Sequence, residues 1–116
     1  MTAVGADHLE SLFTALADPT RRTVMGRVAG QGPVTASELA RHLPVSRQAI
    51  ARHLTVLRDA GLVDSARIGR ETRFTLTPEP LDELARWAVR VGRQWDARLQ
   101  ALSELAARGA DGNGEP

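Results

Sequence analysis

The sequence predicts a mostly α-helical fold with one small β-hairpin, in the order α-α-α-α-β-β-α. Three observations predict it: apolar residues recur at helical spacing through most of the chain, two short helical segments meet at a tight turn, and the period changes to that of strands between residues 62 and 76. The chain has 116 residues, of which 42% are hydrophobic, so we expect one globular domain over residues 1–108. The glycine-rich residues 109–116 are expected to form a disordered tail.

The first two helices are predicted from an apolar stripe and a cap. Residues 7–17 carry apolar side chains three and four positions apart, which is the spacing of one helix face: Leu9, Leu12, Phe13 and Leu16. Asp18 is a favourable N-cap for the second helix, and Pro19 fits its first position because the N–H that proline lacks has no partner there. The glycines and the proline of residues 30–33 end this helix.

Two further helices are predicted on either side of a tight turn. Thr35 and Glu38 form a capping box, in which each side chain accepts a hydrogen bond from the backbone of the other residue. Pro44 ends the first of these helices, and Ser46 is the N-cap of the next. The second helix is predicted to run to about residue 60 and to stop at Gly61. Two short helices joined in this way form a helix-turn-helix.

A β-hairpin and a long helix complete the predicted fold. Residues 62–68 and 71–76 are short segments in which apolar residues are mixed with polar ones, and Gly69-Arg70 lies between them as the turn. Two prolines then interrupt the chain before a final helix over about residues 81–108. A hairpin that follows a helix-turn-helix predicts a winged helix-turn-helix, in which the hairpin is the wing.

Positive charge is concentrated in the middle of the chain. The net charge of the whole sequence is only +1, but residues 41–73 hold seven arginines and three acidic residues, a local net charge of +4. Residues 1–40 hold three arginines and four acidic residues, and residues 74–116 hold five and seven. A basic segment between neutral or acidic flanks is typical of a surface that contacts phosphate groups.

The second helix of the helix-turn-helix is predicted to read DNA bases. With Ile50, Leu54 and Leu57 facing inward, the outer face presents side chains that pair with bases in the major groove. Arginine pairs with guanine, glutamine with adenine, and a methyl group packs on the methyl group of thymine. The predicted DNA-binding residues are Ser46, Arg47, Gln48, Ala51, Arg52 and Thr55 on this helix, and Arg67, Arg70 and Arg73 on the hairpin.

The last helix is predicted to form a homodimer. Its apolar residues are spaced three and four apart over more length than so small a core needs, so a two-fold mate is expected to cover them, with the first helix alongside. The predicted dimerisation residues are Leu9, Leu12, Leu84, Ala88, Val91, Trp95, Leu99 and Leu102. The alternative is an amphipathic helix packed on the core of its own chain.

Composition and motifs exclude several classes of protein. The chain has no cysteine, which excludes disulfides, thiolate metal sites and cysteine nucleophiles. It has no phosphate-binding loop, no His-Glu-x-x-His motif and no dinucleotide glycine signature, so we expect neither an enzyme nor a cofactor. No apolar run is long enough for a membrane helix and residues 1–10 lack the pattern of a signal peptide, so we expect a cytoplasmic protein that does not bind membranes.

A winged helix that binds another protein instead of DNA is the main alternative function. Such a module needs no arginines on the outer face of its helix-turn-helix. The presence of Arg47, Arg52 and Arg70 therefore favours DNA as the partner.

Two segments of the sequence resemble the ArsR family of bacterial repressors. The first is Ala17-Asp18-Pro19-Thr20-Arg21-Arg22, and the second is SRQAIARHLTVLRDAGLV over residues 46–63. The similarity extends over roughly residues 8–106. The resemblance implies a homodimer that binds an inverted repeat in double-stranded DNA, represses its own operon and releases DNA on a signal. The inducer is not identified by any residue of the sequence.

The sequence departs from the metal sensors of that family. A thiolate site in those relatives follows a Glu-Leu pair in the third helix, but here Glu38-Leu39 is followed by Ala40-Arg41-His42. The other common site uses histidines and carboxylates on the last helix, and residues 81–108 contain no histidine. The chain resembles the metal-free branch, as does the tryptophan pattern around Trp95, so no metal site is expected. Ala51 stands where relatives often carry serine, which bears on operator preference.

Overall fold

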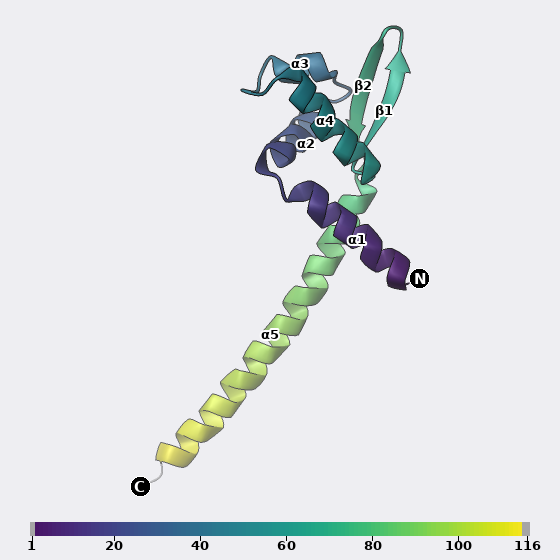
Figure 1. Ribbon diagram of the computed structural model, residues 1–116. Helices are drawn as coiled ribbons and strands as arrows, with labels where there is room; N and C mark the ends of the chain where they lie inside the picture. Colours follow the sequence, from purple (N-terminus) through teal and green to yellow (C-terminus); the bar gives the residue numbers. More distant parts are fainter. Residues whose placement is uncertain (1, 115–116) are drawn as a thin grey trace. The chain divides into compact units, whose positions relative to one another are not determined.

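The predicted order of elements is confirmed (Figure 1). The computed structural model describes residues 2–114, and side chains over residues 7–109. The helices are α1 (Thr2–Leu16), α2 (Pro19–Gln31), α3 (Ala36–Ala40), α4 (Arg47–Asp59) and α5 (Glu79–Gly114), and the strands are β1 (Val63–Ile68) and β2 (Glu71–Leu76). The fold is therefore mostly helical with a two-stranded antiparallel wing, as the sequence predicted.

The three predicted N-caps are present. The Asp18 side chain accepts a hydrogen bond from the Arg21 backbone N–H at 3.0 Å. Thr35 and Glu38 form the full capping box, with Glu38 N–H donating to Thr35 Oγ1 at 3.1 Å and Thr35 N–H donating to Glu38 Oε1 at 3.0 Å. Ser46 Oγ accepts from the backbone N–H of Ala49 at 3.1 Å. These caps satisfy backbone donors that the first turn of each helix would otherwise leave unpaired.

The chain divides into two compact units, over residues 1–84 and 85–116. The buried core and the apolar side chains packed against it extend only as far as Leu84, which explains the boundary. Helix α5 also continues to Gly114, beyond the predicted end near Arg108 and into the predicted disordered tail. Glycines weaken a helix there by only about 1 kcal/mol each and keep the N–H that proline lacks. Residues 115–116 of that tail lie outside the described residues.

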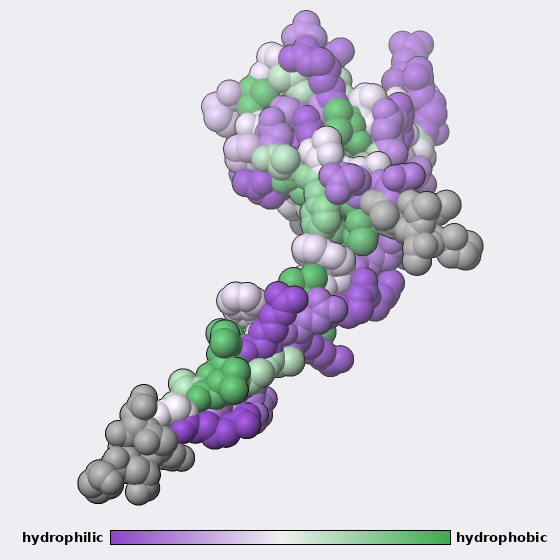
Figure 2. All heavy atoms as spheres, turned by 60° about the horizontal axis from the view of Figure 1, so that its bottom comes forward, coloured by the Kyte–Doolittle hydropathy of each residue, from purple (hydrophilic) through white to green (hydrophobic). Residues whose placement is uncertain are grey.

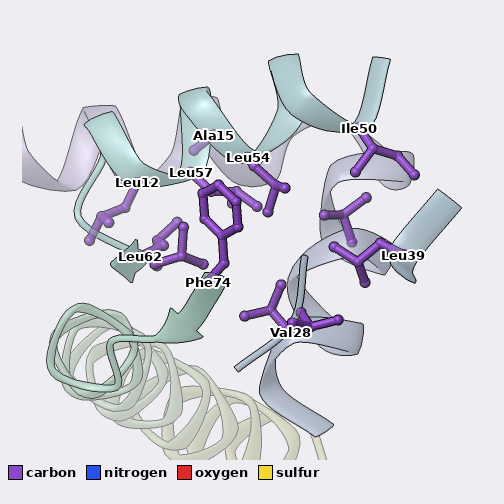
Figure 3. Close-up of a cluster of buried hydrophobic side chains, with 12 residues drawn as sticks. Leu12, Ala15, Val28, Leu39, Ile50, Leu54, Leu57, Leu62 and Phe74 are labelled. Carbon is purple, nitrogen blue, oxygen red and sulfur yellow. The ribbon is translucent and has the colours of Figure 1, made fainter. Parts of the chain in front are cut away.

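The core of the first unit lies beneath α4 (Figure 3). Ile50, Leu54 and Leu57, the stripe predicted to face inward, are fully buried. Figure 3 shows Phe74 pointing from β2 towards the side of α4 that carries Leu54 and Leu57. The other buried residues of the hydrophobic core come from the remaining elements and the loops between them: Leu12, Ala15, Val24, Val28, Val34, Leu39, Leu62 and Val63. Burial of this face sets which side of α4 remains exposed.

The wing is joined to the loop before α3. Strands β1 and β2 pair from Val63 opposite Leu76 to Ile68 opposite Glu71, and Gly69 turns the chain with a φ of 64°. Val34 forms a bridge to β2, since its N–H donates to the Phe74 carbonyl at 3.1 Å and the Phe74 N–H donates to its carbonyl at 2.8 Å. A Cβ at Gly32 would lie 2.7 Å from the Val28 carbonyl oxygen, so only glycine fits where the loop approaches the wing.

Candidate nucleic-acid interface

The outer face of α4 is open. Arg47, Gln48, Ala51, Arg52 and Thr55 are all exposed. Four of them point away from the buried stripe of α4, whereas Arg47 lies in the first turn, in line with Leu54, and is exposed because the helix begins there. Two of them have contacts within the chain. Arg47 Nη1 donates to Ser37 Oγ of α3 at 3.5 Å, and Thr55 Oγ1 donates to the Ala51 carbonyl at 3.0 Å. The first two turns of α4 thus expose two arginines and a glutamine.

The wing arginines differ in their surroundings. Arg67 near the end of β1 and Arg70 in the turn are exposed. Arg73 on β2 is instead only 29% exposed and is held by two carboxylates. Its Nη2 donates to Glu71 Oε1 at 2.7 Å and its Nη1 to Glu38 Oε1 at 3.3 Å. The structure therefore leaves Arg67 and Arg70 open to a ligand, whereas Arg73 faces its own chain.

A groove lies between α3, α4 and the wing. Its volume is about 630 Å³, and both polar and apolar side chains line it. Ser37 on α3 and Arg41, the C-cap of α3, contribute to its wall and were not among the residues predicted from sequence. The sequence did carry a signal for them: residues four positions apart lie on the same side of a helix, so Ser37 and Arg41 could have been assigned to one face. The remaining lining residues are Thr35, Ala36, Glu38, Arg47, Ala51, Thr55, Arg70, Glu71, Thr72, Arg73 and Phe74.

Arg21 and Arg22 close the C-terminal end of α1. Arg21 Nη1 donates to the Ala15 carbonyl at 3.1 Å, and Arg22 Nη1 donates to the Leu16 carbonyl at 2.6 Å. Arg21 Nε also reaches His53 Nδ1 of α4 at 3.4 Å. Backbone carbonyls at the end of a helix carry partial negative charge, so arginines stabilise them. The two arginines therefore have a structural role, and Arg21 also connects α1 to α4.

Two caps hold their carboxylates in the ionised form. The hydrogen bond from the Arg21 backbone N–H lowers the pKa of Asp18, and the charge of Arg21 acts in the same direction. The backbone N–H and side chain of Thr35 lower the pKa of Glu38, helped by the charge of Arg73. A carboxylate that accepts hydrogen bonds from backbone N–H groups is stabilised in its charged form.

Known proteins with similar sequences and structures are transcription regulators. A family described as a helix-turn-helix domain matches residues 16–66. The transcriptional repressor SdpR of Bacillus subtilis (strain 168) is 30% identical over 81 residues, which are 70% of this chain and 89% of that protein. An ArsR-like transcriptional regulator from Rhodococcus sp. RHA1 is 42% identical with a TM-score of 0.76, over 87% of this chain and 94% of that one.

A second solved structure, that of an ArsR family transcriptional regulator, is 33% identical with a TM-score of 0.70, over 78% of this chain and 93% of that one. The chain belongs to the ArsR family. It is a winged helix-turn-helix transcription regulator, and the helix-turn-helix is its DNA-binding element. The exposed outer face of α4 in this ArsR-family regulator belongs to that helix-turn-helix.

The ArsR-family regulator exposes apolar side chains along α5 (Figure 2). Figure 2 shows them gathered on the helix, and the largest are Val89, Val91, Trp95, Leu99, Leu102 and Leu105, which are 42–61% exposed. Other residues predicted to form the dimer are placed differently. Leu12 is fully buried in the core of its own chain, which corrects its assignment to a partner surface, because it has no exposed area to offer. Leu9 and Leu84 are partly buried against the same core, while Ala88 is exposed.

The described side chains form no group of three or more histidine, cysteine, aspartate or glutamate residues that could hold a metal ion. His8 pairs with a single carboxylate, Glu83, at 3.1 Å. Among the residues that the structure describes, no helix is long and apolar enough to span a membrane.

Proposed function

We propose that this ArsR-family regulator is a homodimeric repressor that binds an inverted-repeat operator in its own promoter. The observation that carries the proposal is the open outer face of α4. Arg47 and Arg52 have no carboxylate within ion-pair distance among the described side chains, so their charges are available to DNA. The named relative SdpR is a transcriptional repressor, which supports the same role for this chain.

Base reading is assigned to the N-terminal half of α4. An α-helix fits the major groove, and its first turns approach base edges most closely. Arg47 and Arg52 carry the forked donors that pair with guanine, and Gln48 can pair with adenine. Ser46 begins the helix, where backbone N–H groups favour a phosphate. Ala51 and Thr55 supply small side chains that pack against thymine methyl groups.

Phosphate binding is assigned to the wing and to the C-cap of α3. Arg67 and Arg70 are exposed at the end of the hairpin, and Arg41 lines the groove that separates the wing from α4. Contacts of this kind supply affinity and fix the register of a protein on DNA, but they carry no sequence information.

A second copy of the chain is the proposed cover for the apolar face of α5. Val91, Trp95, Leu99 and Leu102 are spaced by three or four residues and are exposed in the single chain. Contiguous apolar surface of this kind marks an interface between proteins. A two-fold dimer presents two copies of α4, and two such helices read two half-sites of opposite orientation.

A DNA-binding titration tests the proposal. The purified protein is titrated against labelled DNA from upstream of its own gene and against the same DNA with scrambled sequence, each at two salt concentrations. We expect tighter binding to the natural sequence by about 10³-fold or more, and weaker binding to both DNAs at the higher salt. Equal affinity for the two sequences would contradict operator recognition. Absence of binding would favour the protein-interaction alternative.

Metal ions are not expected to release the DNA. The same titration with added zinc or arsenite should give an unchanged affinity, because the described side chains bring no more than two metal-ligating groups together. A large fall in affinity on adding either ion would show that the regulator has a sensor site.

A further inference from the structure

Arg73 joins three parts of the first unit. Its guanidinium donates to Glu71 on the wing at 2.7 Å, to Glu38 of α3 at 3.3 Å and to the Pro33 carbonyl at 3.4 Å. Glu38 lies 35 residues earlier in the sequence, so this contact is long-range. The planar fork of an arginine suits several acceptors at once, and a guanidinium so engaged has few donors left for another ligand.

The partners of Arg73 are themselves held in place. Glu38 Oε1 also accepts the hydrogen bond of the Thr35 backbone N–H, so Arg73 is tied to the capping box that begins α3. Next to Arg73 in the sequence, Phe74 pairs with Val34 through two backbone hydrogen bonds of 2.8 and 3.1 Å. The ion pair and the backbone bridge therefore attach the same part of β2 to the segment that leads into α3.

The local charge argues against a phosphate contact. Arg73 contributes one positive charge, and Glu38 and Glu71 contribute two negative charges within 3.3 Å of it. The two carboxylates therefore offset the charge of Arg73, whereas Arg70 in the turn has no carboxylate within ion-pair distance among the described side chains and is the more favourable partner for a phosphate.

We infer that Arg73 is a positioning residue that fixes the wing at a set distance from α3 and α4, across the groove that holds the DNA backbone. The inference rests on the proposed function, because the wing must be placed correctly only if it and α4 bind the same DNA. Arg73 lines the groove together with Arg41 and Arg47 of the opposite wall, so its contacts to α3 set how far the arginine of the turn lies from α4.

A double variant, Glu38→Gln with Glu71→Gln, separates positioning from phosphate binding. Glutamine at position 38 keeps the capping box, since its side-chain oxygen still accepts from Thr35, but it removes the charge that holds Arg73. If Arg73 positions the wing, operator affinity falls about fivefold or more, despite the loss of two negative charges near DNA. If Arg73 binds phosphate, its freed charge raises the affinity, and the inference is wrong.

The salt dependence of Arg73→Ala gives a second readout. Loss of a positioning residue lowers operator affinity without changing the slope of log affinity against log salt, because no phosphate contact is lost. Loss of a phosphate contact lowers the slope by about 1, as expected for the matched variant Arg70→Ala. Thermal unfolding of each variant shows that it is folded at the assay temperature. A slope for Arg73→Ala equal to that of Arg70→Ala overturns the inference.

Hydrogen exchange in the absence of DNA tests the positioning role independently of the proposed function. Arg73→Ala is expected to speed exchange of the Val34 and Phe74 amides, while the amides in the middle of α4 stay protected. Unchanged exchange at Val34 and Phe74 would overturn the inference even where operator binding is confirmed. Conversely, failure of the wild-type protein to bind DNA would refute the proposed function. The exchange result would still decide whether Arg73 holds the wing against the segment that leads into α3.

Discussion

Arg52 is the residue of α4 whose guanidinium has the fewest constraints. It is exposed and has no ion pair among the described side chains, whereas Arg47 contacts Ser37. If Arg52 reads a guanine, Arg52→Ala weakens operator binding by about 1–3 kcal/mol and relaxes the preference at one base pair. The measurement is a titration against the operator and against operators substituted one base pair at a time.

The control for Arg52 is Arg108→Ala, which removes the same charge from α5. This variant should bind the operator as the wild type does, so any general effect of net charge is measured separately. Equal losses in the two variants would mean that Arg52 acts through net charge and does not read a base.

Arg70 tests phosphate contact, as Arg52 tests base reading. It lies in the turn of the wing beside Gly69, and it is exposed. If Arg70 binds phosphate, Arg70→Ala weakens binding to every sequence by a similar factor and lowers the salt slope by about 1. Titrations of operator and scrambled DNA at several salt concentrations measure both quantities. A loss confined to the operator would instead assign base reading to Arg70.

At the scale of elements, helix caps make the stability of the first unit depend on pH. The pKa values of Asp18 and Glu38 lie below their ordinary values of 3.8 and 4.5, chiefly because each carboxylate accepts a backbone hydrogen bond. A lowered pKa in the folded state means that the contribution to stability is complete above the ordinary value and is lost as the pH falls through the folded value. We expect the unfolding temperature to fall as the pH is lowered below about 4.5.

Asp18→Asn is the matched variant for this pH dependence. Asparagine is as good an N-cap as aspartate but does not titrate, so the variant should keep α2 while losing part of the acid sensitivity. Thermal unfolding followed by circular dichroism between pH 3 and pH 7 measures the difference. Parallel curves for the variant and the wild type would show that Asp18 contributes nothing to the acid response.

Elements were predicted well where the determining contacts are local. The N-caps at Asp18, Thr35 and Ser46 and the turn at Gly69 each depend on residues within four positions, and each is present in the structure. The Val34 bridge to β2 was not predicted, because it joins residues far apart in the sequence. The end of α5 was also misplaced, since glycines alone do not stop a helix.

At the scale of the whole molecule, a substitution in the apolar face of α5 tests the proposed dimer. Trp95→Glu places a charge at the centre of the proposed interface and should weaken dimerisation by about 2 kcal/mol or more, because a buried tryptophan is often an interface hot spot. Sedimentation at several protein concentrations measures the monomer–dimer equilibrium. Operator affinity should fall with it, since a monomer binds only one half-site.

Gln100→Glu is the control for this interface. It adds the same charge to the same helix, roughly 140° around the axis from Trp95, because successive residues of an α-helix are about 100° apart. The control should remain dimeric. A dimer that survives Trp95→Glu would mean that the apolar face of α5 has another partner, or that the two-fold contact lies elsewhere.

Two assignments show where reasoning from sequence stops. Leu12 and Leu99 both lie on apolar stripes with helical spacing, but Leu12 is fully buried in its own chain and Leu99 is 47% exposed. Spacing identifies an apolar face and does not identify what covers it. Likewise Arg70 and Arg73 are both arginines of one hairpin, yet only Arg73 lies beside Glu38 and Glu71.

The sequence by itself determined the helices, their caps, the position of the wing and the outer face of α4. These features depend on backbone preferences and on side chains a few positions apart, so the order of residues specifies them directly. Only the tertiary structure decided that Arg73 is paired, that Arg21 reaches His53 and that Leu12 lies in the core. Those contacts join distant segments, and packing of the shared core brings the segments together.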